Sequence, residues 1–398
     1  MDTSIDRQFD GKLSVENRYD YLNLNTCRFL WKQVKFPLAT DVPNAGTKVV
    51  KQGEVQGSDI AAHSAGILDL KTTIHPDADV LFVTAVDKYG HELWRWTFPI
   101  DKLNQVKEEL SPLSGKATYT ETDNDLTVKA NNHTFVFSKK DGQLKGVSVN
   151  NRKISFANGP RFIGARRADR SLDQFYNHDD EKAKEKDRTY SEFPDAAVFT
   201  KLDVREDGGN LIITANYKLG NLDKAQWTIN PSGIVTLDYT YNFSGVVDLM
   251  GICFDYPEEQ VISKRWLGAG PYRVWQNRIH GTQYDIWEND YNDPIPGETF
   301  TYPEFKGYFG DVSWMNIRTK EGTSSLTNEM PGTYVGRYQP RDGRDRLLYT
   351  LPESGISVLN VIPPVRNKVN STDLCGPSSQ PKWVNGSQTG RIVFRFTE

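Results

Sequence analysis

The feature that most constrains this chain is a period-two alternation of apolar and polar residues. In GIVTLDYTY, Val235, Leu237, Tyr239 and Tyr241 fall on one side of an extended chain, and the intervening polar residues fall on the other. Because successive side chains of a strand point to opposite faces, this pattern predicts a half-buried strand. The same period recurs along the chain and helical periodicity is almost missing, so we expect an all-β fold.

Two segments predict β-hairpins. Residues 79–98 read as two strands joined at residues 88–91, with Trp94, Trp96 and Phe98 sharing one face. Residues 135–149 read as a second pair, in which Asp141-Gly142 supplies the positive backbone angles of a tight turn. The charged stretch at 178–192 suggests a solvated loop or one short helix.

The polar segment at 101–125 separates two strand-rich blocks and contains Pro112 and Gly115. We therefore expect residues 1–105 to form an immunoglobulin-like β-sandwich, because its turn signals come at short intervals. Residues 106–117 would be the linker, and residues 118–398 a large two-sheet β-sandwich.

Composition argues against several classes of partner. The 48 Lys plus Arg against 52 Asp plus Glu leave no basic excess to neutralise a phosphate backbone, so no nucleic acid partner is expected. No apolar run is long enough to cross a bilayer, so no membrane partner is expected either. Cys27, Cys253 and Cys375 lie far apart, and the six histidines show no metal-binding spacing. We expect three buried thiols, no metal and no cofactor.

The stretch RWLGAGPYRVWQNRIHGTQYDIWENDYND, residues 265–293, carries the densest mixture of rings and polar groups. A dinucleotide loop is a poor fit, because Arg273 stands where the third glycine should be. Gly268 and Gly270 permit unusual backbone angles and Pro271 fixes the exit of the chain, so a tight turn is expected.

The same stretch has the residue types of a sugar site, in which rings stack on the C–H face of a pyranose and polar side chains bind its hydroxyls. The alternative is that these rings pack the rim of a sheet, and a single strand would split them between two faces. The candidate carbohydrate-binding residues are Tyr272, Arg273, Trp275, Asn277, Arg278, Trp287, Tyr291 and, in the following YPEFKGYF, Glu304. No catalytic residue is predicted, since 52 acidic residues allow dozens of carboxylate pairs.

Several segments together resemble the C-terminal part of glycoside hydrolase family two, the β-galactosidase family of bacteria. FDGKLSVENRYDYLNLNTCRFLWKQ resembles the opening of that family's immunoglobulin-like domain, where a motif of the type NxYDFxxLxxxxxxW recurs. RWLGAGPYRVWQNR is similar to the signature WxGxGPxExYxDR of its terminal β-sandwich. The first likeness is carried by Asn17, Tyr19, Asp20, Leu22, Asn23, Leu24 and Trp31, and the second by Trp266, Gly268, Gly270, Pro271, Trp275 and Arg278.

The resemblance implies a galactose-mutarotase-like supersandwich over residues 118–398. It also implies that the catalytic acid and nucleophile, both glutamates, lie upstream in a (β/α)₈ barrel of about 250 residues. No such pattern occurs in this chain, and Arg273 takes the position of a family glutamate. We therefore expect the partners to be that upstream barrel and a carbohydrate, either a galactoside or a plant polysaccharide fragment.

The leading hypothesis is a non-catalytic C-terminal part of a family-two glycosidase, inactive alone, whose parent protein acts on β-galactosides or related glycans. One alternative is a stand-alone carbohydrate-binding module. A less favoured one is an aldose epimerase with a Glu base and a His acid, for which His280 alone lies near the candidate residues. The compartment stays open, with a bacterial periplasmic or extracellular location favoured if the chain is part of an exported protein.

Overall fold

The computed structural model describes residues 5–39, 46–100, 114–167, 190–193, 195–290, 307–330, 332–337, 355–364 and 376–398. Within these ranges the chain forms β-strands and short 3₁₀ turns, without an α-helix. The all-β prediction is therefore confirmed. The chain divides into two compact units, Met1–Val106 and Lys107–Glu398.

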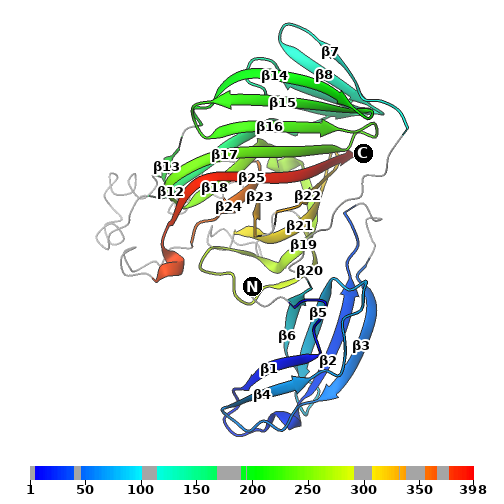
Figure 1. Ribbon diagram of the computed structural model, residues 1–398, viewed down its shortest axis with the longest axis vertical. Helices are drawn as coiled ribbons and strands as arrows, with labels where there is room; N and C mark the ends of the chain where they lie inside the picture. Colours follow the sequence, from blue (N-terminus) through cyan, green and yellow to red (C-terminus); the bar gives the residue numbers. More distant parts are fainter. Residues whose placement is uncertain are drawn as a thin grey trace. The chain divides into compact units, whose positions relative to one another are not determined.

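The first unit holds two antiparallel sheets (Figure 1). One pairs β1 with β4, and the other has the order β3-β2-β5-β6. A core that includes Phe29, Leu68 and Leu81 draws side chains from both sheets, and the predicted hairpin at 88–91 joins β5 to β6 as expected. The strands are β1 (Lys12–Asn17), β2 (Arg28–Lys35), β3 (Lys48–Gln56), β4 (Ser64–Asp69), β5 (Val80–Val86) and β6 (Glu92–Pro99).

The NRYDYLNL segment of this unit owes its conformation to Asn17, which is only 1% exposed. Its amide Nδ2 donates to the carbonyl oxygens of Leu22 at 2.8 Å and Ile60 at 2.9 Å. Its Oδ1 accepts from the backbone N–H of Tyr19 at 3.0 Å. One buried side chain thus satisfies three backbone groups and fixes the loop that leads to the turn η1 (Leu24–Thr26).

The second unit is a large sheet system (Figure 1). One run of paired strands is β14-β15-β16-β17-β25-β22-β21-β19-β20. The hairpin strands β7 to β10 connect through β12 to β18, β24 and β23, which pairs back to β21. The short strands β11 and β13 lie beside β10 and β12.

The bounds of these strands are β7 (Thr118–Glu121), β8 (Asp125–Ala130), β9 (His133–Ser138), β10 (Leu144–Val149), β11 (Arg152–Ile154), β12 (Ala157–Arg167), β13 (Tyr190–Glu192), β14 (Val198–Asp207), β15 (Asn210–Lys218), β16 (Leu222–Ile229), β17 (Val235–Val247), β18 (Leu249–Asp255), β19 (Val261–Val274), β20 (Gln283–Asp290), β21 (Tyr308–Thr319), β22 (Gly322–Asn328), β23 (Tyr334–Arg337), β24 (Ile356–Val361) and β25 (Lys382–Thr397).

Aromatic rings fill the core of the second unit. Trp227 of β16 meets Phe137 of β9 at 5.7 Å between ring centroids, and Phe254 of β18 meets Phe394 of β25 at 5.4 Å. The alternation predicted for residues 235–241 is confirmed, since Leu237 and Tyr241 are fully buried in this core. Edge-to-face and tilted rings of this kind bury large areas and hold the layers together.

Several predictions are refined by the structure or are not tested by it. Only Gly142 of the Asp141-Gly142 turn takes a positive φ, of 75°. Most of the charged stretch at 178–192, like most of the predicted linker at 106–117, lies outside the described residues. The immunoglobulin-like assignment of the first block and the domain bounds stay predictions.

Candidate functional site

The expected tight turn at GAGP is wrong. Residues 261–274 form one continuous strand, β19, which pairs with β20 and β21. The two glycines instead let neighbouring groups pack directly against the backbone of β19. A Cβ on Gly268 would lie 2.8 Å from the carbonyl oxygen of Gly310, and a Cβ on Gly270 would lie 2.4 Å from the ring of Trp287. Glycine at these positions lets a backbone and an indole pack directly on β19.

Trp287 rests in the space that Gly270 leaves open. Its Nε1 donates to the carbonyl oxygens of Gly268 and Gln283, each at 3.1 Å. The ring is partly buried against the large core. The indole is therefore fixed by β19 and β20, as expected for the packing alternative.

Trp275 and Arg273 lie inside the protein. Trp275 is 1% exposed and packs edge-to-face on Tyr308 at 5.6 Å, in a second apolar cluster that includes Cys253 of β18. Arg273 is 6% exposed, and its guanidinium lies 5.8 Å from the ring centroid of Phe309. Neither side chain offers a ring or a donor to solvent in this structure.

The turn that follows β19 is fastened to the C-terminal part of the chain. The amide of Gln276 donates to the carbonyl oxygens of Ser378 and Gln380, at 3.0 and 2.8 Å. The amide of Asn277 donates to Ser379 Oγ at 2.9 Å. These contacts hold the turn against η7 (Pro377–Ser379) and occupy the Asn277 amide.

Two of the candidates reach the surface. Tyr272 of β19 is 40% exposed, and its hydroxyl lies 3.4 Å from the carbonyl oxygen of His280. Arg278 is exposed in the loop between β19 and β20. Tyr291 and Glu304 lie outside the described residues. An exposed phenol ring and a guanidinium could contact one carbohydrate, but the six candidates that the structure describes do not converge on a common pocket.

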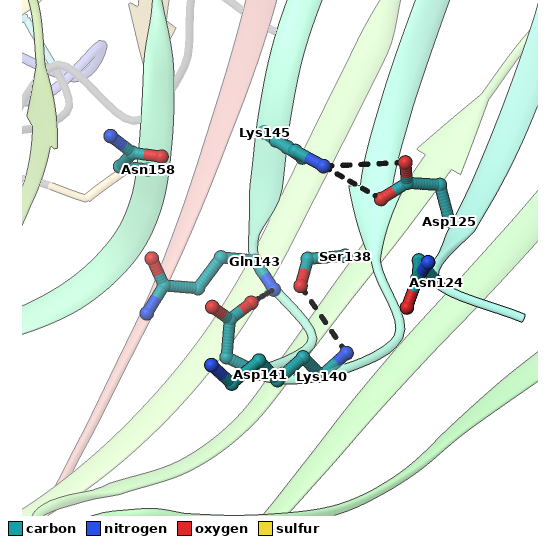
Figure 2. Close-up of a pocket in the computed structure, with 8 residues that line it drawn as sticks. All are labelled: Asn124, Asp125, Ser138, Lys140, Asp141, Gln143, Lys145 and Asn158. Carbon is teal, nitrogen blue, oxygen red and sulfur yellow. Dashed lines mark hydrogen bonds and ion pairs between the residues drawn. The ribbon is translucent and has the colours of Figure 1, made fainter.

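Sequence reasoning missed a polar pocket of about 310 Å³ in the second unit (Figure 2). Asn124, Asp125, Ser138, Lys140, Asp141, Gln143, Lys145 and Asn158 line it. The ammonium of Lys145 lies 3.0 and 3.2 Å from the two carboxylate oxygens of Asp125. The predicted turn at Asp141-Gly142 supplies part of the lining, but nothing in the sequence indicated that Asn158 would line the same pocket.

Asn158, which lines this pocket, also bonds to one member of an ion pair. Arg161 Nη2 donates to Asp255 at 2.6 Å, and Asn158 Nδ2 donates to the other carboxylate oxygen at 2.7 Å. Burial by itself would raise the pKa of Asp255, but these hydrogen bonds lower it below its ordinary value. The carboxylate is therefore kept ionised as a structural anion.

The described residues contain no group of three or more His, Cys, Asp and Glu side chains placed to hold a metal ion. No helix in those residues is long and apolar enough to cross a membrane. Burial raises the pKa of the Cys253 thiol to about 11, and Cys27 is also buried. Cys375 lies outside the described residues.

Comparison with known proteins gives a family and remote structural likenesses. No curated protein is significantly similar in sequence. The chain is similar to a galactose 1-epimerase from Lactobacillus acidophilus, with 9% identity over 72% of this chain and 99% of that one, at a TM-score of 0.40. A GalM/aldose epimerase homologue from C. elegans has 6% identity over 71% of this chain and 99% of that one, at a TM-score of 0.32.

The family comparison is more informative than these likenesses. Residues 129–395 match the family described as beta galactosidase small chain. The match includes β19 with its two close-approach glycines, the turn bound to η7 and most of the core strands. Because it spans well over half of the chain, this protein belongs to the beta galactosidase small chain family.

Proposed function

We propose that this chain is the non-catalytic C-terminal region of a family-two glycoside hydrolase, which supports a separate catalytic barrel. The observation that carries the proposal is the family match over residues 129–395. The family's name, a small chain, implies a larger partner that supplies the catalytic residues. A barrel in the same protein and a barrel in a second polypeptide are both compatible with this role.

The contacts made by the ring-rich stretch at 265–290 support a structural role for it. Arg273, Trp275 and Trp287 are engaged in packing, and Asn277 is bound to Ser379. Buried side chains fix the sandwich, whereas Tyr272 and Arg278 remain exposed for a partner. We infer that these two contact either the barrel or the carbohydrate that it binds.

The domain organisation belongs to the same proposal. The first 105 residues would be the immunoglobulin-like domain and residues 118–398 the mutarotase-like sandwich, with the linker between them. Two compact units that divide at Val106 and Lys107 are compatible with this assignment. The substrate would be a β-galactoside or a related plant glycan.

The test is a reconstitution with the catalytic barrel of the parent enzyme. The purified chain alone should not hydrolyse nitrophenyl β-galactoside, and adding it to the isolated barrel should raise the hydrolysis rate at least tenfold. A variant with Arg278→Ala and Tyr272→Ala should activate the barrel less well. A matched control, Tyr21→Ala, removes a ring that is 95% exposed in the first unit and should activate normally.

Glycosidase-like turnover by the chain alone would overturn the proposal, as would a barrel whose rate is unchanged by the chain. Polarimetry on fresh α-galactose tests the epimerase alternative. Neither the pocket of Figure 2 nor a second pocket on β16, β17 and β25 is lined by a histidine. We therefore expect no acceleration of mutarotation.

A further inference from the structure

The outward side of β17 and β25 forms a long polar surface in the second unit. The two strands pair without a register shift from Val235↔Phe394 to Val247↔Lys382. Leu237, Tyr239 and Tyr241 of β17 enter the core, so the residues between them point outward. We call this surface the β17–β25 face; it consists of Asp238, Thr240, Asn242 and Ser244 on β17, Trp383, Asn385, Ser387, Thr389 and Arg391 on β25, and Lys224 on β16.

A pocket of about 260 Å³ opens at one end of the β17–β25 face. Its lining includes the charged residues Lys224, Asp238 and Arg391 and the hydroxyl-bearing residues Thr240 and Thr389. These groups offer both donors and acceptors, as a sugar with many hydroxyls requires. The size suits one or two sugar rings rather than a folded protein element.

Charges around this pocket are balanced. Arg391 lies 3.6 Å from Asp238 and 3.5 Å from Glu329, and Lys224 adds the second cation. Two cations therefore face two anions. A polyanion such as a nucleic acid or a pectin needs a basic excess, so the balance favours a neutral ligand.

Trp383 stands at the other end of the β17–β25 face and is 70% exposed. Among the described residues it is the most exposed tryptophan, ahead of Trp94 at 43% and Trp96 at 42%. Large rings are usually buried, and an exposed indole beside polar side chains is typical of a surface that stacks on a ligand.

The distance between the ring and the pocket suits an extended ligand. Arg391 lies eight residue steps after Trp383 along β25, a distance of about 26 Å at the rise of a strand. Asn385, Ser387 and Thr389 point outward between them and supply an amide and two hydroxyls. A short oligosaccharide could span this row with its apolar face on the indole and its hydroxyls on the polar side chains.

We propose that the β17–β25 face binds a neutral oligosaccharide, with Trp383 stacking on one sugar ring and Asp238 and Arg391 binding hydroxyls of another. This site is distinct from Tyr272 and Arg278. It also goes beyond the proposed function, because it needs no catalytic barrel. It would hold a glycan chain on the sandwich while the barrel cuts it elsewhere.

Titration calorimetry of the full chain with cellohexaose and with β-1,4-galactohexaose tests the proposal. We expect binding of at least one of the two in the micromolar to millimolar range. Trp383→Ala should weaken that binding about tenfold, the loss expected when one stacked ring is removed. Asp238→Asn should weaken it severalfold, since the shape is kept and the acceptor strength is reduced.

Trp94→Ala is the matched control, because it removes an exposed indole of the first unit and should leave the affinity unchanged. Thermal unfolding of each variant confirms that the fold is intact. Absence of heat with both hexaoses, an equal loss of affinity in Trp94→Ala, or tighter binding of polygalacturonate would each overturn the proposal. None of these results alters the barrel reconstitution, so the two proposals fail separately.

Discussion

At the scale of single residues, burial decides the chemistry of the thiols. Cys253 packs among apolar side chains next to Trp275 and Tyr308, and desolvation raises the pKa of its thiol to about 11. The thiolate that reacts with alkylating agents is thus scarce at neutral pH. The expectation of buried thiols is met by Cys27 and Cys253.

We predict that Cys253 reacts with iodoacetamide at pH 8 at least a hundredfold more slowly in the native protein than in urea, because the native thiol is both buried and protonated. Peptide mass spectrometry after timed labelling measures this for each cysteine. Cys27, also buried, serves as the internal comparison. Rapid native labelling of Cys253 would contradict the packing described for β12, β18 and β24.

A second residue-scale prediction concerns Asp255 and acid stability. Its folded pKa lies below the ordinary value of 3.8, so the unfolded state takes up the proton first as the pH falls. The stabilisation is present above about pH 4 and is lost as the pH falls through the folded pKa. Since the carboxylate side chain is half exposed, the contribution at neutral pH is about 1 kcal/mol or less.

Asp255→Asn should therefore lower stability at pH 7 and flatten the loss of stability that occurs as the pH falls below about 4. Urea unfolding at a series of pH values gives both quantities. Asp207→Asn is the control, because Asp207 is exposed and lies 3.6 Å from Arg205 without further side-chain partners in the described contacts. An unchanged pH profile in Asp255→Asn would exclude the proposed role of the Arg161 and Asn158 hydrogen bonds.

At the scale of elements, β19 depends on glycine for space rather than for backbone freedom. A Cβ on Gly268 would lie 2.8 Å from the carbonyl oxygen of Gly310, which belongs to the backbone of β21 and cannot rotate away. Gly268→Ala should cost about 2 kcal/mol of unfolding free energy, in the range of overpacked cores. Denaturant unfolding followed by tryptophan fluorescence measures the change.

Gly146 offers a matched control in β10, because a Cβ there meets no atom within 4 Å and its φ is not in the left-handed region. Gly146→Ala should change stability by less than about 0.5 kcal/mol. Equal losses of unfolding free energy in the two variants would show that the general preference of a strand for alanine or glycine, and not the close approach of Gly310, governs the effect.

At the scale of the whole molecule, the two units have separate cores. Phe29, Trp31 and Leu81 belong to the core of the first unit, and Trp227 and Phe254 to that of the second. Domains with their own cores commonly unfold as separate transitions. We predict two transitions in calorimetry, with the larger enthalpy from the second unit because it contains more residues.

Phe29→Ala should lower the midpoint temperature of only one transition, and Trp227→Ala that of only the other. Each substitution should reduce the unfolding free energy of its unit by about 3 to 5 kcal/mol. The smaller enthalpy peak should move with Phe29 and the larger one with Trp227. A single peak that shifts in both variants would mean that the units unfold together.

The sequence was sufficient to predict those features of the fold that depend on interactions between neighbouring residues. The alternation of Val235, Leu237, Tyr239 and Tyr241 predicted both a strand and its buried side, because consecutive side chains of a strand must diverge. The hairpin at 88–91 was predictable from the same alternation on both sides of a turn, and the turn at Gly142 from the positive φ that glycine adopts at little cost. The motif at 265–278 also indicated a β-galactosidase-like C-terminal region, and the match of residues 129–395 to the beta galactosidase small chain family supports that coarser statement.

Only the tertiary structure decided which polar and aromatic side chains reach the surface. Trp275 is buried because Tyr308, more than thirty residues away, packs on it, and Trp287 is fixed by the space above Gly270. Asp238 and Arg391 share a pocket because β17 pairs with β25, which composition and local pattern do not encode. Strand periodicity follows from backbone geometry, whereas exposure follows from contacts between distant segments, and a site for a ligand depends on both.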